Sequence, residues 1–265
     1  MTWRGQLRRG LEIGTALPRA VLSRFFVGHP RGPRFSGVWQ TRPAASMACG
    51  TAGYDDEGIA DVSFDLMCVR AVWDYPIIFW LKRLLPDHPT VIDAGGHMGT
   101  KYIAFSDVLN LRDVRWTVYD LPGIVAAARA RQGTGGIPQA IGFEHALDAL
   151  GSADVLIGSG LLQYLDRPFA DFVGALDEKP KHILLNKVAT RDGPSIFTAE
   201  RIGCNRVPYQ IRNRNSWEAE IAAMGYDIVD SWTIPELGHV ITTHPWLGRS
   251  ESRGYVLQLQ KAMSA

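Results

Sequence analysis

The sequence predicts an α/β fold: a doubly wound, mostly parallel sheet of seven strands, preceded by an N-terminal helical extension. Two observations predict it. From residue 90 onward, short apolar runs typical of buried strands alternate with helical patterns, and this alternation requires right-handed crossovers and a parallel sheet. A glycine-rich turn over residues 95–99 also follows the first apolar run directly and precedes a helical pattern, as in nucleotide-binding α/β proteins. We expect three parts: an N-terminal arm and linker over residues 1–46, a helical cover over 47–89 and a ligand-binding sheet domain over 90–265.

Length and composition limit the classes of protein to which the chain can belong. With 265 residues and 46% hydrophobic content, the chain can bury the core of one full domain plus an extension. Its three cysteines, Cys49, Cys68 and Cys204, have no C-x-x-C spacing. Scattered cysteines argue against a disulfide framework or a zinc site and fit a reducing cytoplasm. No apolar stretch approaches the ~20 residues of a membrane span. We therefore expect a cytoplasmic protein without a bound metal.

The charge is distributed unevenly. Residues 1–42 hold eight arginines against the single acid Glu12, a net charge of +7 that leaves −6 for the remainder. An acidic body argues against nucleic-acid binding, so only the arm suits a polyanion. Apolar residues from Leu7 to Phe25 share one helical face, which Pro18 interrupts. Two interpretations stay open: the arm contacts an anionic inner-membrane surface peripherally, or it packs on its own domain or lacks fixed structure.

Three segments before the sheet are predicted from local signals. The prolines between residues 28 and 46 indicate a linker. The turn at Gly53-Tyr54-Asp55-Asp56 leads into a helix that begins near Glu57, and a second helix runs from about residue 69 to 85. Trp73 on the second helix either lines a pocket or belongs to the core, and its spacing alone does not decide between them.

Acidic residues end the first two predicted strands. Val91-Ile92 is followed by Asp93, and the strand over residues 114–120 ends at Asp120, 21 residues beyond Gly99. A doubly wound nucleotide fold places its ribose-binding carboxylate at about this distance. The alternative role for Asp120 is the N-cap of a helix that starts at Pro122. Because parallel strands end at one edge of the sheet, Asp93 and Asp120 are expected to lie close together there, with Ser159 and Gln163.

The remaining elements continue the alternation. They are a helix at 123–131, a strand at 139–143, a short helix at 144–150, a strand at 154–158, a helix at 168–176, a strand at 182–186, a helix at 215–224 and strands at 227–234 and 254–260. The last two strands are joined by a loop too short for a parallel crossover, which predicts an antiparallel pair. Residues 187–213 show little periodicity, and we expect a substrate lid there.

With these residues in place, the chain resembles class I S-adenosylmethionine (SAM) methyltransferases, which have a Rossmann-like sheet and the turn D-x-G-x-G-x-G. Here the turn begins at Asp93, and His97 stands where the family has its middle glycine. The resemblance implies that Asp93 faces the cationic ammonium of the methionine moiety, whereas it would repel a pyrophosphate. A glycine-rich turn that binds nothing is the alternative.

More narrowly, the chain resembles a bacterial family of methyltransferases found among polysaccharide-biosynthesis genes. The segments that carry this resemblance are Gly37-Val38-Trp39, Gly53-Tyr54-Asp55, Pro76, residues 93–102 and residues 162–168. Asp120-Leu121-Pro122 is also similar to O-methyltransferases of the caffeate and hydroxyindole type, in which a histidine base stands where this chain has Gln163. The resemblance implies methyl transfer from SAM to a small-molecule or glycan acceptor, through its hydroxyl group.

The candidate site residues fall into three groups. The residues expected to bind the cofactor are Asp93, Gly95, Gly96, His97, Gly99, Tyr102, Asp120, Leu121, Glu144, Ser159 and Gly160. Those expected to contact the acceptor are Tyr54, Trp73, Tyr164 and Tyr209. The candidate catalytic residues are His97, Gln163 and His239, and His145 and His244 are further candidates for a base. His239 and His244 are too few to form a metal site.

Two other functions compete with methyl transfer. A nicotinamide-dependent reductase would use the same sheet, but Asp93 and His97 oppose it, and no Tyr-x-x-x-Lys pair occurs in the chain to serve hydride transfer. A non-catalytic, membrane-associated SAM-binding protein would keep the cofactor cleft without a base. Gln163 and the basic arm motivate this second alternative.

Overall fold

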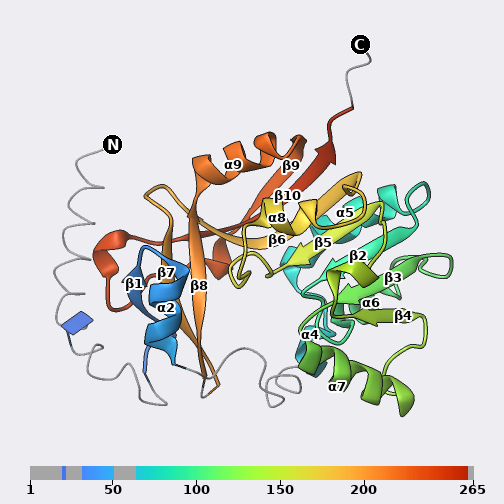
Figure 1. Ribbon diagram of the computed structural model, residues 1–265, viewed down its shortest axis with the longest axis horizontal. Helices are drawn as coiled ribbons and strands as arrows, with labels where there is room; N and C mark the ends of the chain where they lie inside the picture. The colour runs from blue at the N-terminus through green and yellow to red at the C-terminus, as the bar shows by residue number, and fades with distance from the viewer. Residues whose placement is uncertain (1–19, 22–31, 51–63, 204, 262–265) are drawn as a thin grey trace. The chain divides into compact units, whose positions relative to one another are not determined.

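The computed structural model describes residues 20–21, 32–50, 64–203 and 205–261. The chain forms two compact units (Figure 1). The first unit comprises Met1–Tyr54, Ala189–Arg214 and Pro235–Ser252, and the second comprises Asp55–Val188, Asn215–Ile234 and Arg253–Ala265. This division differs from the expected boundaries at residues 46 and 89, because segments from three parts of the sequence build the first unit. Most of the basic arm lies outside the described residues.

Five parallel strands form the centre of the second unit, in the order β4-β3-β2-β5-β6. They are β2 (Thr90–Ala94), β3 (Arg115–Tyr119), β4 (Ile141–Glu144), β5 (Val155–Ser159) and β6 (His182–Arg191). The predicted mostly parallel α/β sheet is therefore confirmed.

Two further strands, β10 (Glu251–Leu259) and β9 (Tyr226–Ile234), extend the order, since β10 pairs with both β6 and β9. At one end of the β9–β10 pair, Gln260 N donates to Gly225 O at 2.9 Å. At the other end, the Arg253 guanidinium donates to Thr233 at 3.2 Å. The residue numbers rise along one strand as they fall along its neighbour, so the last pair is antiparallel, as expected.

Helices follow the predicted alternation along the second unit. They are α4 (Phe64–Met67), the 3-10 turn η1 (Val72–Asp74), α5 (Tyr75–Leu84), α6 (Thr100–Phe105), α7 (Pro122–Gly133), the 3-10 turn η2 (Leu147–Ala149), α8 (Phe169–Gly174) and α9 (Arg214–Ala223), which starts at the last residue of the first unit. The helix expected over residues 69–85 is instead η1 followed by α5. Pro76 in the first turn of α5 explains the break, because proline has no N–H to extend a preceding helix.

Alternating strand residues bury into two separate cores. Val91 of β2 and Ile157 of β5 belong to one apolar cluster with residues of α5, α6 and α7. Their neighbours Ile92 and Leu156 belong to another cluster with residues of α8 and α9. Since successive strand residues point to opposite faces, helices cover both faces of the sheet. This explains why these strands are continuous apolar runs in the sequence.

The first unit contains strands where a linker was expected. Its elements are β1 (Phe35–Trp39), the helix α2 (Arg42–Cys49), β7 (Ile196–Ile202), β8 (Asn205–Asn213) and the end of β6. The expected linker over residues 28–46 is therefore wrong from Phe35 onward. Pro43 lies in the first turn of α2 behind the N-cap Thr41, whose side chain accepts a hydrogen bond from Ala44 N at 3.4 Å. Here the proline marks a helix start.

Residues 187–213 are more regular than their weak periodicity predicts, because they contain the second half of β6 and a β-hairpin; the substrate lid stays a prediction. β7 pairs antiparallel with β8, β1 pairs antiparallel with β7, and Thr190–Arg191 at the end of β6 pair in parallel with Arg212–Asn213. The structure thus adds three strands, β1, β7 and β8, to the seven that were predicted.

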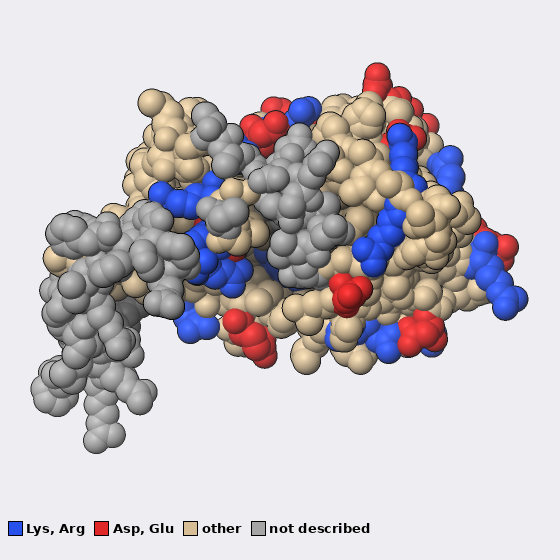
Figure 2. Space-filling view, turned by 90° about the horizontal axis from the view of Figure 1, so that it is seen from below, with Lys and Arg blue, Asp and Glu red and all other residues tan. Residues whose placement is uncertain are grey.

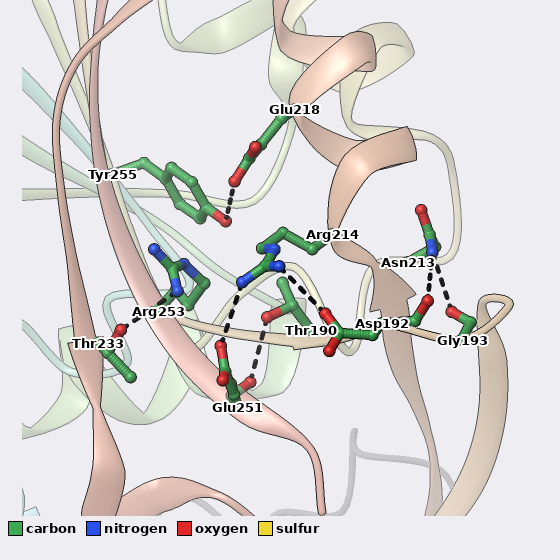
Figure 3. Close-up of polar contacts among 10 residues, drawn as sticks. All are labelled: Thr190, Asp192, Gly193, Asn213, Arg214, Glu218, Thr233, Glu251, Arg253 and Tyr255. Carbon is green, nitrogen blue, oxygen red and sulfur yellow. Dashed lines mark hydrogen bonds and ion pairs between the residues drawn. The ribbon is translucent and has the colours of Figure 1, made fainter. Parts of the chain in front are cut away.

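Polar contacts within the first unit hold the segments that enter and leave this hairpin (Figure 3). Arg214 contacts Asp192 at 3.1 Å and Glu251 at 3.7 Å. The Asn213 side-chain amide donates to the carbonyl oxygens of Asp192 and Gly193 at 3.2 and 3.1 Å. On the face drawn in Figure 2, basic and acidic side chains both occur over the described surface. In the parts of the chain that the structure describes, no helix combines the length and the apolar character that a bilayer crossing needs.

Candidate functional site

The carboxyl edge of the parallel strands in the second unit brings the predicted residues together. From β2, the chain proceeds to β3 and β4 on one side, whereas β5 and β6 lie on the other. Ala94 is in register with Tyr119 on β3 and with Gly158 on β5. The strand order therefore changes direction between β2 and β5, and ligands of open α/β sheets bind at such a switch point.

The glycine turn after β2 depends on backbone geometry at three positions. Gly95, His97 and Gly99 have φ values of 70°, 56° and 77°, in the left-handed region that favours glycine. His97 adopts this conformation at the position where the resembling family has its middle glycine, at a cost of order 1–2 kcal/mol. A side chain on Gly99 would also collide with Ile141, since an added Cβ would lie 2.7 Å from its Cδ1. Gly96 is required for space, because its Cβ would lie 2.6 Å from the Asp93 carboxyl carbon.

Asp93 lies beneath this turn and is 1% exposed. Neither carboxyl oxygen has a hydrogen-bond partner among the described residues. The pKa of Asp93 is raised to about 7: burial raises it most and the nearby charge of Asp120 adds to this, whereas Lys101 and the Trp116 indole lower it. The indole is close enough to favour the ionised form, but its N–H makes no hydrogen bond. The turn thus encloses a carboxyl group that has no hydrogen-bond partner among the described residues.

Asp120 links β3 to the glycine turn. One carboxyl oxygen accepts a hydrogen bond from His97 N at 2.7 Å, and the other accepts one from Leu121 N at 2.8 Å. The N-cap residue of α7 is Leu121, so Asp120 stands one residue before the N-cap position that the alternative role gives it. The two acids predicted from the strand ends lie close together, as expected.

The segment after β5 supplies further polar atoms. Gly160 has φ 78°, and its N–H donates to the Asn186 carbonyl at 2.9 Å. The Ser159 hydroxyl and the Gln163 side-chain carbonyl are buried without partners in the described part of the chain. Buried polar groups in proteins are nearly always hydrogen-bonded, so unpartnered ones at a strand edge indicate a place for a ligand.

The turn η1 is held at this edge by two contacts. The buried Asp74 carboxylate pairs with the Lys101 ammonium of α6 at 2.7 Å. The Asn186 amide, where the pairing of β6 with β5 ends, donates to the Trp73 carbonyl at 2.8 Å. The Trp73 indole N–H is itself buried without a partner among the described residues. These contacts place Trp73, predicted as an acceptor contact, at the site.

Lys187 is a residue of this edge that sequence reasoning did not identify. It follows Asn186 on β6, has φ 61°, and places its ammonium 5.8 Å from the centre of the Trp73 ring. Burial lowers the pKa of Lys187 to about 8. The segment from 187 onward was assigned to a lid. The available signal was the one that identified Asp93 and Asp120, a polar residue at the carboxyl end of an apolar run.

Tyr209 and His239 lie in the first unit. The Tyr209 hydroxyl contacts His239 Nε2 at 3.2 Å, and the His239 ring stacks on Phe35 at 4.2 Å. Burial lowers the pKa of His239 to about 4, helped by the charges of Arg34 and Arg249. Burial likewise raises the pKa of Tyr209. Within its own unit, His239 thus belongs to an aromatic cluster.

The other predicted residues have structural contacts or lie outside the described part. Glu144 pairs with Arg129 of α7 at 3.4 Å, and the Tyr102 ring packs against Trp116 with centroids 5.7 Å apart. Tyr164 N donates to the Leu161 carbonyl at 3.0 Å in the turn after β5. Tyr54 lies outside the described residues. In the described ranges, no three His, Cys, Asp or Glu side chains gather as a metal site would require.

No protein-family model and no curated protein matches this chain. Among solved structures, it is similar to a 1,6-didemethyltoxoflavin-N1-methyltransferase of Burkholderia thailandensis with bound S-adenosylhomocysteine, with 18% identity, 72% of this chain and 79% of that chain covered, and a TM-score of 0.47. It is also similar to a glycopeptide N-methyltransferase complexed with SAM, with 14% identity, coverage of 72% and 95%, and a TM-score of 0.48. A third similar structure is a mitomycin 7-O-methyltransferase, with 14% identity, coverage of 75% of this chain and 54% of that chain, and a TM-score of 0.45. Similarities of this size do not carry an activity or a ligand over to this chain.

Proposed function

We propose that the second unit binds SAM at the carboxyl edge of β2, β3 and β5, and that the protein is a SAM-dependent methyltransferase. One observation carries the proposal: the glycine turn encloses the unpartnered Asp93 carboxyl group, beside the equally unpartnered Ser159 hydroxyl and Gln163 carbonyl. These are acceptor groups, and a ligand with a cationic ammonium and several N–H and O–H donors would satisfy them.

The residues present fit such a ligand. An ionised Asp93 supplies a negative charge where a cation would lie, whereas a dinucleotide pyrophosphate would meet repulsion from the same charge. A carboxylate has about four lone-pair sites, so Asp120 can accept hydrogen bonds from a ligand hydroxyl as well as from the backbone N–H groups of His97 and Leu121. We assign the ribose hydroxyls to Asp120, because it ends β3 at this edge, 21 residues beyond Gly99.

When bound, SAM supplies a methyl group already activated by a positively charged sulfur. The chain's main contribution is then to align an acceptor with that methyl group, an effect worth up to ~7–11 kcal/mol in favourable cases. Trp73 provides an aromatic wall with one N–H, and Gln163 provides an amide. Such a combination suits a ring-containing acceptor with hydroxyl groups, so we propose O-methylation of a small molecule or glycan.

Calorimetric titration of the purified protein with SAM and, separately, with NADH tests the proposal. SAM is expected to bind and NADH is not, and binding of NADH without SAM would refute the assignment. Asp120→Ala is expected to weaken SAM binding by ~1–3 kcal/mol, the scale of hydrogen bonds to a charged group. Asp113→Ala, which removes an exposed acid just before β3, is the matched control and should leave the affinity unchanged. Equal affinity of both variants and the wild type would show that Asp120 does not hold the ribose.

A further inference from the structure

Lys187 lies at the point where β6 leaves β5. The paired register of β5 and β6 ends at Ser159 and Asn186, and the next residue has a left-handed backbone. In a regular strand, successive side chains point to opposite faces. Here both side chains contact Trp73: the Asn186 amide donates to the Trp73 carbonyl, and the Lys187 ammonium lies over the Trp73 ring. The unfavourable backbone of Lys187 thus turns its side chain toward the site, and non-glycine residues in such conformations cluster at functional sites.

The surroundings of the Lys187 side chain are mostly uncharged. A Cβ built on Gly160 would lie 3.7 Å from both Lys187 Cδ and Gln163 Nε2, so both side chains lie beside this glycine. Two charged groups face the ammonium, Lys101 and Asp74, and they pair with each other. Among the described residues, Lys187 has neither a hydrogen bond nor an ion pair that would hold its proton.

We propose that Lys187 is the catalytic base that removes the acceptor's proton during methyl transfer. This inference rests on the proposed function. As the acceptor oxygen forms its bond to the methyl carbon, the carbon–sulfur bond breaks and its electron pair stays on sulfur. The acceptor's O–H bond breaks as well, and its proton ends on the neutral Nζ of Lys187, which becomes an ammonium and later returns the proton to water.

The position of Lys187 also explains how the site can have a base although residue 163 is a glutamine. An amide side chain does not accept a proton at neutral pH, so Gln163 itself is not a base. The lysine lies beside it, next to the same glycine, and burial brings the pKa of Lys187 to about 8, where a neutral amine is available near physiological pH. Gln163 is then free to orient the acceptor.

The first test measures the titration of Lys187 without any substrate. Trace acetylation with acetic anhydride across a pH series, read by peptide mass spectrometry, reports the neutral fraction of each lysine. Lys181, on the chain just before β6, is an internal reference, because its hydrogen bond to Asp154 raises its pKa. Acetylation of Lys187 is expected to rise through pH ~8, well below the range for Lys181. A Lys187 that follows Lys181, or that stays unreactive throughout, overturns the inference, because a base must be neutral and reachable.

The second test compares Lys187→Met with Lys82→Met, which removes an exposed lysine of α5. SAM affinity is measured by calorimetry, and transfer is measured with SAM carrying a ¹³C-methyl group and a small-molecule extract of the source cells. Lys187→Met is expected to bind SAM as the wild type does but to transfer ~100-fold or more slowly, with loss of the rate increase near pH 8. Lys82→Met is expected to match the wild type.

The outcomes separate the two proposals. If SAM binds and Lys187→Met transfers as fast as the wild type, Lys187 is not the base and the proposed function stands. If the wild type binds no SAM, or forms no labelled product, the methyltransferase assignment falls and the role of Lys187 falls with it.

Discussion

Replacing Asp93 by asparagine tests the electrostatics on which the site depends. The folded protein holds this carboxyl with a pKa of about 7, against an ordinary value of 3.8 for an aspartic acid side chain. Because the folded state binds the proton more tightly than the unfolded chain, this group's contribution to folding stability falls as pH rises from about 4 to about 7 and then levels off. At ~1.4 kcal/mol for each tenfold change in proton affinity, the difference between these two pKa values corresponds to a cost of ~4 kcal/mol above pH 7.

Asp93→Asn has nearly the same shape and does not titrate, so it lacks this pH-dependent cost. Between pH 5 and pH 8, the stability of the variant relative to the wild type is expected to rise by ~2–3 kcal/mol. Any fixed cost of burying the new amide cancels in this difference. Urea unfolding at both pH values measures it, with the exposed Asp113→Asn as a matched control. A stability difference that stays constant between pH 5 and pH 8 would show that Asp93 is already ionised in the free protein.

Three further outcomes are expected. SAM binding near pH 7 releases a proton, because a cation beside Asp93 favours its ionised form. Calorimetry in buffers of different ionisation enthalpy counts the released protons. If none is released, the cation does not lie beside Asp93. Gly99→Ala is expected to destabilise the fold by ~1–3 kcal/mol, because residue 99 has a left-handed backbone and the added Cβ would clash with Ile141. The control Gly133→Ala adds its Cβ to open space in α7 and is expected to have no such effect. Chemical denaturation of the two variants makes the comparison. Asp74→Asn leaves the Lys101 ammonium without its partner and costs ~3–5 kcal/mol in unfolding free energy, and an unchanged melting temperature would contradict this.

The parallel strands were predictable because both of their faces are buried. Their residues read as continuous apolar runs, and β2 through β5 begin and end within one or two residues of the prediction. The strands of the first unit lack this signal. In β7 and β8, the buried positions include Thr198, Glu200 and Arg212. Glu200 is paired with Arg34 of the segment before β1 at 2.6 Å. Buried polar residues that are satisfied by distant partners look like loop residues in a single sequence.

The site was predictable to a similar extent. Asp93 and Asp120 could be located because each ends a recognisable strand, and parallel strands bring such ends together. The position of Trp73 depends on Asn186 and on the Asp74–Lys101 pair, contacts between residues far apart in the sequence. No local pattern encodes these contacts, so the sequence alone offers Trp73 only as a candidate.

Among the residues that the structure describes, the two non-glycine residues of positive φ are His97, which is one departure from the methyltransferase pattern, and Lys187, which lies beside the other departure, Gln163. His97 replaces the middle glycine of the turn, yet it adopts the backbone that glycine would, and its N–H holds Asp120. Gln163 replaces a histidine base, and Lys187 reaches the same glycine from the neighbouring strand. A left-handed residue is unfavourable unless surrounding contacts fix it. Its occurrence at one departure and beside the other favours a site that is rebuilt for chemistry over one that has lost it.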